Sequence, residues 1–179
     1  MSFTAEYQAR LAGPWTDIRD QLALLHLTAA GYPWPRICEF GVRTGESTCA
    51  FLAAAEQAGG HVWSWDVAEP QVPGHWLASP LWTFTRGRSE TARLPGCDIL
   101  FIDTSHEHAQ TLAELRHLAP AVLAGGRILL HDTKLDDPPF EPLAVARAAD
   151  DWCKEAGRSW RELGGRYGLG EIVIEERTQ

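Results

Sequence analysis

The sequence predicts an α/β protein with a doubly wound, mostly parallel sheet that ends in a C-terminal antiparallel hairpin. Short apolar stretches alternate with segments of helical periodicity, which is typical of a parallel sheet covered by helices. Near the C-terminus, the strand-like stretches 159–163 and 171–175 are joined only by a glycine-rich link, too short for a helical crossover. The length of 179 residues predicts a single domain. Its expected parts are an N-terminal helical segment at 1–35 and a core at 36–176.

The first half of the chain shows helix, strand, glycine turn and helix in succession. Thr16 or Asp17 can cap a helix with apolar residues at helical spacing, which stops at Gly31. A second helix is expected over Ser47–Ala58, closed by the glycine pair that follows. Proline-rich sequence leaves space for only a turn or two of helix after the second strand. Strands are predicted at 37–40, 61–65 and, more weakly, 81–85.

The second half continues the alternation before the hairpin. An amphipathic helix is expected over 107–123 and should end at Gly125 and Gly126. A second helix is expected over 142–157. Strands are predicted at 98–102 and 127–130, which with the hairpin brings the expected number to seven.

The composition excludes several classes of partner and site. Sixteen basic and twenty-four acidic residues give a net charge of −8, so binding to nucleic acid or to an anionic membrane is not expected. No signal pattern and no membrane-spanning apolar run is present. The cysteines form no CxxC pair, which predicts free thiols in a reducing, cytoplasmic environment. They are Cys38, Cys49, Cys97 and Cys153.

A glycine turn after the first strand is the first candidate ligand site. Gly41 and Gly45 let the backbone turn tightly, and Ser47 can cap the next helix. The GxxxG spacing differs from the dinucleotide and phosphate-loop motifs. Glu39, just before the turn, favours a cationic ligand, and Asp66 stands where a ribose-binding carboxylate is expected. The alternative is that these residues only form a strand-to-helix turn.

Five motifs in order resemble the small class I S-adenosylmethionine-dependent methyltransferases. The similar branch includes O-methyltransferases that act on sugars and natural products, and the likeness covers roughly 36–176. It implies a Rossmann-like seven-stranded fold with S-adenosylmethionine as cofactor. The motifs are ICEFGVRTGEST, WSWDVAE, RGRSETARLPGCDILFIDTSHEH, LAGGRILLHDT and RYGLGEIVI.

The resemblance also implies roles for individual residues. Asp66 would bind the ribose hydroxyls, and Ser89 would lie near the adenine. Thr104 and Ser105 depart from the Gly-Asp pair usual in the family, which affects the expected substrate contacts. The methionine end of the cofactor and the backbone turn would be lined by Glu39, Gly41, Thr44, Gly45 and Ser47.

Titratable residues gather where the fourth and fifth predicted strands end. Asp103 and His106 follow one strand, and His131 and Asp132 end the next. One hypothesis places a divalent cation such as Mg²⁺ on Asp103 and Asp132, with His131 as a further candidate ligand. The other needs no metal and uses His106 or His131 as the general base. Asp103 could also only cap the following helix.

The expected function is methyl transfer from S-adenosylmethionine to a hydroxyl of a small molecule, a sugar or natural product. Two alternatives remain at this point: a cofactor-binding module without activity, and a metal-dependent enzyme of this fold with different chemistry. Trp15, Trp34 and Trp76 fall in segments outside the expected sheet, where they could line the acceptor pocket or a homodimer contact.

Overall fold

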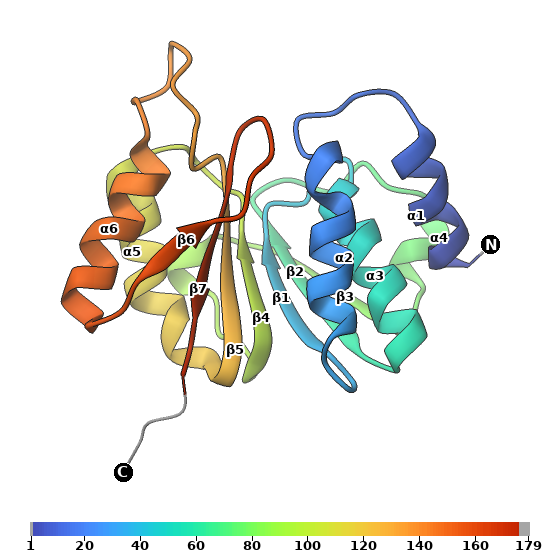
Figure 1. Ribbon diagram of the computed structural model, residues 1–179. Coiled ribbons are helices and arrows are strands. Elements are labelled where there is room, and N and C mark those ends of the chain that lie inside the picture. The colour runs from blue at the N-terminus through green and yellow to red at the C-terminus, as the bar shows by residue number, and fades with distance from the viewer. Residues whose placement is uncertain (1, 176–179) are drawn as a thin grey trace. The chain divides into compact units, whose positions relative to one another are not determined.

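The computed structural model describes residues 2–175, so residue 1 and residues 176–179 of the predicted domain lie outside the described part. The chain divides into two compact units, Met1–Ala92 and Arg93–Gln179, each with its own strands and helices (Figure 1).

The first unit has three parallel strands, as predicted. β2 lies between β3 and β1, with Cys38 opposite Trp63 and Trp63 opposite Thr83. Parallel strands place their carboxyl ends at one edge, so the residues that follow Phe40 and Asp66 lie near each other. The strands are β1 (Arg36–Phe40), β2 (His61–Asp66) and β3 (Trp82–Arg86).

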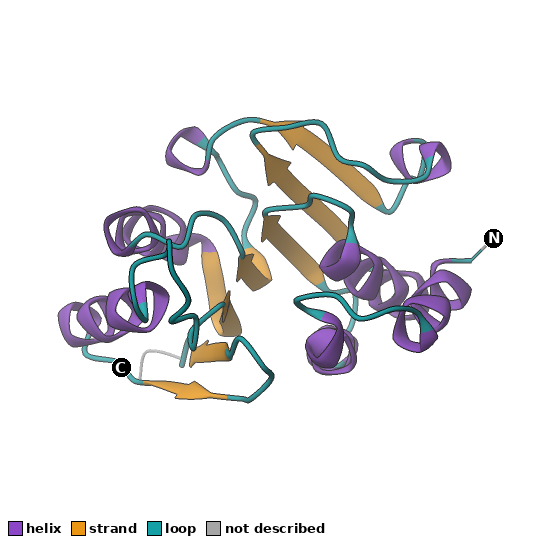
Figure 2. Cartoon of the chain, turned by 90° about the horizontal axis from the view of Figure 1, so that it is seen from above, coloured by secondary structure: helices purple, strands orange, loops and turns teal. Residues whose placement is uncertain are grey.

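Helices cover this first set of strands. α3 packs against both α1 and α2, and α2 and α3 are seen side by side in Figures 1 and 2. In α3, every residue from Ser47 to Ala55 is buried. Only one turn of helix, α4, follows the second strand, as its prolines predict. The helices are α1 (Phe3–Ala12), α2 (Leu22–Ala30), α3 (Glu46–Ala58) and α4 (Gly74–Leu77).

The predicted start of α2, the helix that Thr16 or Asp17 was expected to cap, is wrong. A short 3₁₀ turn, η1 (Arg19–Gln21), comes first, and Gln21 occupies the N-cap of α2. Asp17 does not cap because its carboxylate pairs with Arg43 Nη1 at 2.6 Å. The predicted end at Gly31 is confirmed.

Glu56 on α3 anchors the first turn of α1. Its carboxylate accepts hydrogen bonds from Phe3 N at 3.1 Å, Thr4 N at 2.9 Å and Thr4 Oγ1 at 2.9 Å. These N–H groups have no partner within the helix, so Glu56 supplies acceptors that a helix start requires. Partial burial opposes ionisation, but the hydrogen bonds from Thr4 and Phe3 outweigh it and hold the Glu56 pKa below its usual value.

We therefore expect Glu56→Gln to lower the free energy of unfolding at neutral pH by about 1 kcal/mol, the scale of a lost helix cap. A carboxylate with a lowered folded-state pKa stabilises the fold above its unfolded pKa and loses that effect as pH falls. Urea unfolding at a series of pH values should show the difference from the parent shrinking below about pH 4.5. A difference that is constant across pH would contradict this role.

The second unit holds four strands in the order β4-β5-β7-β6. β4 and β5 are parallel, whereas β7 pairs antiparallel with both β5 and β6. The predicted hairpin is confirmed, and so is the fold class: a seven-stranded, mostly parallel sheet flanked by helices. The strands are β4 (Cys97–Ile102), β5 (Val122–His131), β6 (Trp160–Glu162) and β7 (Leu169–Val173).

Two helices, α5 (His108–Leu118) and α6 (Ala144–Ala156), pack side by side in the second unit (Figures 1 and 2). The predicted extent of α5, residues 107–123, is wrong. It ends at Leu118, and a 3₁₀ turn containing Pro120 follows, because proline cannot donate the next helical hydrogen bond. Gly125 and Gly126 therefore do not stop a helix; they lie inside β5, where the pairing register with β4 shifts.

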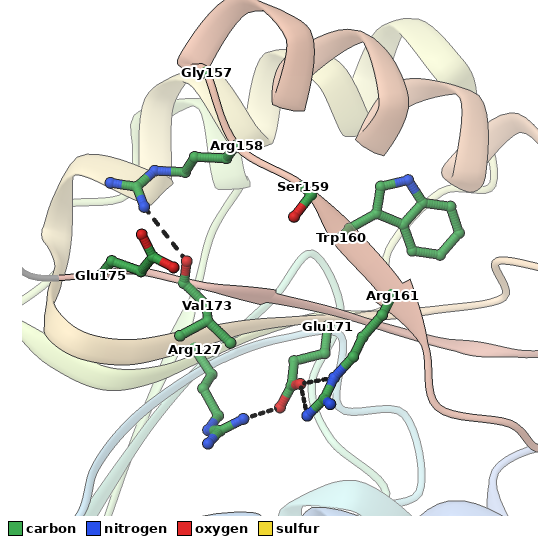
Figure 3. A pocket seen from close by; sticks show the side chains of 9 residues that line it. All are labelled: Arg127, Gly157, Arg158, Ser159, Trp160, Arg161, Glu171, Val173 and Glu175. Atoms are coloured by element: carbon green, nitrogen blue, oxygen red, sulfur yellow. Dashed lines mark hydrogen bonds and ion pairs between the residues drawn. The ribbon is translucent and has the colours of Figure 1, made fainter.

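Glu171 ties the hairpin of the second unit together. This carboxylate is 3% exposed, accepts a hydrogen bond from Arg161 Nε at 2.6 Å and pairs with Arg127. Figure 3 shows it between the two guanidinium groups, at the wall of a cavity of about 620 Å³ that Arg158 also lines. Glu171 pairs with both Arg127 and Arg161. We therefore assign these two arginines a structural role in the hairpin, as partners of a buried carboxylate.

The tryptophans predicted to line a pocket are divided by the structure. Trp76 is fully buried, and its Nε1 donates to Glu6 Oε2 at 2.7 Å, so the expectation of a pocket wall is wrong there. Trp15 and Trp34 are 51% and 72% exposed. Within residues 2–175, no helix is both long enough and apolar enough to cross a membrane.

Candidate active site

The glycine turn of the first unit follows β1. Gly41, Arg43 and Gly45 all have positive φ, at 91°, 49° and 74°, and Gly45 N donates to Val42 O at 2.7 Å. A Cβ at Gly45 would lie 2.7 Å from carbon atoms of both Trp76 and Val72. Glycine is therefore required at this position by the backbone angle and by the packing.

Asp66, at the end of β2, holds this turn in place. Its Oδ2 accepts hydrogen bonds from Val42 N at 2.8 Å and Arg43 N at 3.2 Å, and its Oδ1 accepts one from Ala68 N at 2.9 Å. A carboxylate oxygen has two acceptor positions, so Oδ1 can take a further donor such as a ribose hydroxyl. The structure thus gives Asp66 a positioning role that the sequence did not predict.

Glu39 lies at the carboxyl end of β1 and is 0% exposed. Its carboxylate accepts hydrogen bonds from the hydroxyls of Ser47 at 2.6 Å, Thr48 at 2.7 Å and Ser64 at 2.6 Å. The prediction that Ser47 caps α3 is wrong, since Gly45 occupies the N-cap and the Ser47 hydroxyl binds Glu39. Thr48 and Ser64 were not predicted; Ser64 could have been found as a polar residue on a strand expected to be buried.

The other two residues predicted for the cofactor have different surroundings. Thr44 is exposed, and its carbonyl accepts a hydrogen bond from Arg10 Nη2 at 3.3 Å. Arg10 comes from α1 and also pairs with Glu46, so the first helix supports the turn. Ser89 is 7% exposed and begins a 3₁₀ turn after β3. Arg10 has no motif that could have identified it.

The second unit brings four predicted residues into one cluster. Asp103 follows β4, His131 ends β5, and Asp132 comes next with φ of 63°. His106 Nε2 lies 2.7 Å from Asp132 Oδ2. His131 Nδ1 lies 2.9 Å from the same oxygen and 3.4 Å from Asp103 Oδ1. We name these four residues the Asp–His cluster.

Electrostatics within the Asp–His cluster favour a charged state. The hydrogen bond to Asp132 outweighs burial and raises the pKa of His106. Burial lowers the pKa of His131, but Asp103 and Asp132 together raise it to about 10. Burial raises the pKa of Asp132, yet both histidines bring it down to about 2. The neighbouring carboxylates thus make both imidazoles stronger bases, since they favour the protonated ring.

His131 is the residue whose surroundings are incomplete. Within the described chain, neither of its ring nitrogens has a partner with hydrogen-bond geometry, although both are buried. One ligand atom from each of Asp103, His131 and Asp132 lies within 4.8 Å of the others. Two carboxylates at this spacing are chemically suited to hold a divalent cation.

Three residues near the Asp–His cluster differ in their contacts. Thr104, where the family motif differs, donates to Glu114 Oε2 at 2.8 Å. His108 Nε2 lies 3.0 Å from Asp151 Oδ2, an ion pair between α5 and α6. Phe140, which was not predicted, contacts His106 edge-on with ring centres 4.9 Å apart and is 43% exposed. No motif indicated Phe140, because it lies in an irregular loop.

Comparison with known proteins decides the family. A family model described as a methyltransferase domain matches residues 38–133. The chain belongs to this methyltransferase family. The match confirms the resemblance found in the sequence and the expectation of a methyltransferase. A search of curated proteins found no match.

Solved methyltransferase structures share the fold. MycE, from the mycinamycin biosynthetic pathway and in complex with Mg and SAH, has a TM-score of 0.71 at 16% identity over 98% of this chain; the chain spans 55% of MycE. The O-methyltransferase NovP has a TM-score of 0.67 at 15% identity, covering 88% of this chain and 81% of NovP. The SAH-bound Podospora anserina methyltransferase PaMTH1 has a TM-score of 0.64 at 14% identity, covering 98% and 89%.

Proposed function

We propose that this methyltransferase transfers a methyl group from S-adenosylmethionine to a hydroxyl of a small molecule, a sugar or natural product. The observation that carries the proposal is the His106–Asp132 pair, with an N–O distance of 2.7 Å, in a chain of the methyltransferase family. Oxygen methylation requires a group that removes the hydroxyl proton, and an imidazole oriented by a carboxylate is suited to this task.

The glycine turn of the first unit is the proposed cofactor site. S-adenosylmethionine supplies a methyl group on a positively charged sulfur. Asp66 would accept a hydrogen bond from its ribose, since Oδ1 has a second acceptor position beside the one that Ala68 N occupies. Gly41, Thr44 and Gly45 would line the methionine end, with Ser89 near the adenine. Glu39 and Ser47 would set the shape and negative charge beneath the turn, because the structure pairs them with each other.

Asp103 and Asp132 would hold a divalent cation, as their spacing with His131 permits. Such a cation would supply a Lewis acid that lowers the pKa of a bound acceptor hydroxyl. MycE is crystallised with Mg and SAH, which supports including a cation in the proposal. We also propose a homodimer and a cytoplasmic location; the four buried free cysteines support a reducing environment.

His106 is the proposed general base. Its side chain is 23% exposed, whereas that of His131 is 1% exposed, so only His106 is accessible to an acceptor from solvent. The half-exposed ring of Phe140 beside it would form an apolar wall of the acceptor site. Asp132 accepts from His106 Nε2, which leaves Nδ1 of that ring as the atom that takes the acceptor proton.

Binding of SAH, the demethylated cofactor, tests the proposed cofactor site by calorimetry. In Asp66→Asn an amide replaces the carboxylate that accepts hydrogen bonds from Val42 N and Arg43 N. The glycine turn should therefore be held less firmly in its conformation. We expect the affinity for SAH to fall about tenfold or more, the effect of losing one charged hydrogen bond. Glu69→Gln, an exposed acid in the next segment, is the matched control and should bind as the parent does.

Turnover tests the reaction itself. SAH release should be measured against a panel of hydroxylated acceptors, with and without EDTA. Loss of turnover in EDTA that added dication restores would support the cation, and turnover in EDTA would favour a metal-free base. Absence of SAH binding would overturn the cofactor assignment. Tight SAH binding without turnover on any acceptor would instead indicate a binding module.

A further inference from the structure

We propose that His131 is the third ligand of the cation site, and that the site therefore selects a transition dication such as Mn²⁺ or Co²⁺ over Mg²⁺. This inference rests on the proposed function in one respect, since it concerns the same cation. It assigns to His131 a role as ligand, where the sequence left ligand and base as alternatives.

The distances in the Asp–His cluster match a coordination sphere. Octahedral ligands about 2.1 Å from a cation are about 3 Å apart along each edge. His131 Nδ1 lies 2.9 Å from Asp132 Oδ2 and 3.4 Å from Asp103 Oδ1. One ligand atom of each of the three residues also lies within 4.8 Å of the other two, so small side-chain adjustments would bring all three to one cation.

The surroundings of His131 provide a second, independent argument. The residue is 2% exposed, and neither ring nitrogen has a hydrogen-bond partner within residues 2–175. Buried polar atoms in folded proteins are almost always satisfied. Nδ1 nevertheless lies within 3.5 Å of two carboxylate oxygens, so a cation bound by all three groups would satisfy it.

Burial also separates the roles of the two histidines. His131 has 1% of its side chain exposed and ends a strand in the sheet, so an acceptor from solvent has no access to it. His106, at 23%, follows β4 in a loop. The base and the ligand are thus different residues that both contact Asp132.

The chemistry of the donor set decides the metal. Mg²⁺ prefers oxygen ligands in near-octahedral geometry, whereas imidazole suits transition dications. Asp103 and Asp132 alone would fit Mg²⁺, but the imidazole between them adds a nitrogen donor. We expect the intact protein to bind Mn²⁺ more tightly than Mg²⁺, and Co²⁺ more tightly than Mn²⁺, the order that mixed nitrogen and oxygen ligands give among transition dications.

Electron spin-echo spectroscopy of the Mn²⁺-loaded full chain tests the ligand directly. A coordinated imidazole nitrogen couples to the Mn²⁺ electron spin, so the parent should show a nitrogen modulation. His131→Asn should lose it, and His106→Gln, a matched loss of an imidazole from the same cluster, should keep it. Nitrogen coupling that is absent from the parent, or lost in His106→Gln and kept in His131→Asn, would overturn the proposal.

Selectivity supplies the second measurement. Mn²⁺ and Mg²⁺ affinities should be determined by competition with a fluorescent chelator in the parent and in His131→Asp, whose donors are all oxygen. The Mn²⁺ preference should fall about tenfold or more in the variant. An unchanged preference in a variant with the parent's circular dichroism spectrum would overturn the proposal. If His131→Asp does not fold, His131→Asn serves in the same comparison.

These readouts do not depend on methyl transfer. Nitrogen-coupled Mn²⁺ in a protein that releases no SAH would support the ligand assignment and refute the proposed function. Turnover that persists in EDTA, together with absence of nitrogen coupling, would refute the ligand assignment and leave the methyl transfer intact.

Discussion

Asp132→Asn is expected to lower the methyl-transfer rate by roughly 100-fold or more, the usual contribution of a positioned acid–base group. Asp132 Oδ2 lies within 3 Å of a ring nitrogen of each histidine of the Asp–His cluster. An amide keeps the size of the side chain but removes the charge that orients His106. The backbone should be unaffected, because Asn tolerates the positive φ of 63° found at this residue.

The measurement for Asp132→Asn is SAH release under saturating cofactor, accompanied by calorimetric binding of SAH. The rate should fall while the affinity for SAH stays close to the parent value, since the proposed cofactor residues lie in the other unit of the chain. Asp136→Asn, an exposed acid in the following loop, is the control and should keep the parent rate. A full rate in Asp132→Asn would rule out the Asp132-oriented base.

Gly45→Ala is expected to destabilise the first unit by about 2–4 kcal/mol. Two costs add. An L-residue at φ of 74° is strained, and the new Cβ would lie 2.7 Å from Trp76 and from Val72. Trp76 cannot move aside easily, because it is fully buried and its Nε1 is bonded to Glu6.

Gly157→Ala separates these two costs. Gly157 has φ of 64°, close to that of Gly45, but a Cβ there meets no atom within 4 Å. This control should lose only about 1 kcal/mol from backbone strain. Urea unfolding of both variants would measure the difference, and equal losses would show that the packing against Trp76 adds nothing. Gly45→Ala should also weaken SAH binding, since Gly45 lies in the proposed cofactor turn.

Strand positions could be predicted well because buried strands are short apolar stretches bounded by turn residues. All seven predicted strands exist, and β1 follows its prediction within one residue. Helix ends were predicted less well. α5 stops before its amphipathic pattern does, because Pro120 and the pairing of β5 with β4 compete for the same residues.

For the candidate site residues, the sequence predicted the residue types but not the distances between them. Residue types at strand ends were sufficient to select Asp103, His106, His131 and Asp132, because parallel strands share one edge. Their mutual distances depend on the pairing of β4 with β5 and on the left-handed backbone at Asp132, neither of which a linear pattern contains.

The sequence by itself determined the fold class, the family and the residue types at the proposed site, since these follow from local periodicity and from motifs in order. The tertiary structure alone decided which partner each group has. In it, Ser47 donates to Glu39 and does not cap a helix, and Asp66 accepts hydrogen bonds from the backbone of the glycine turn. His131 is buried beside two carboxylates. The reason is physical: burial and hydrogen-bond geometry arise from segments distant in sequence, so neighbours along the chain do not specify them.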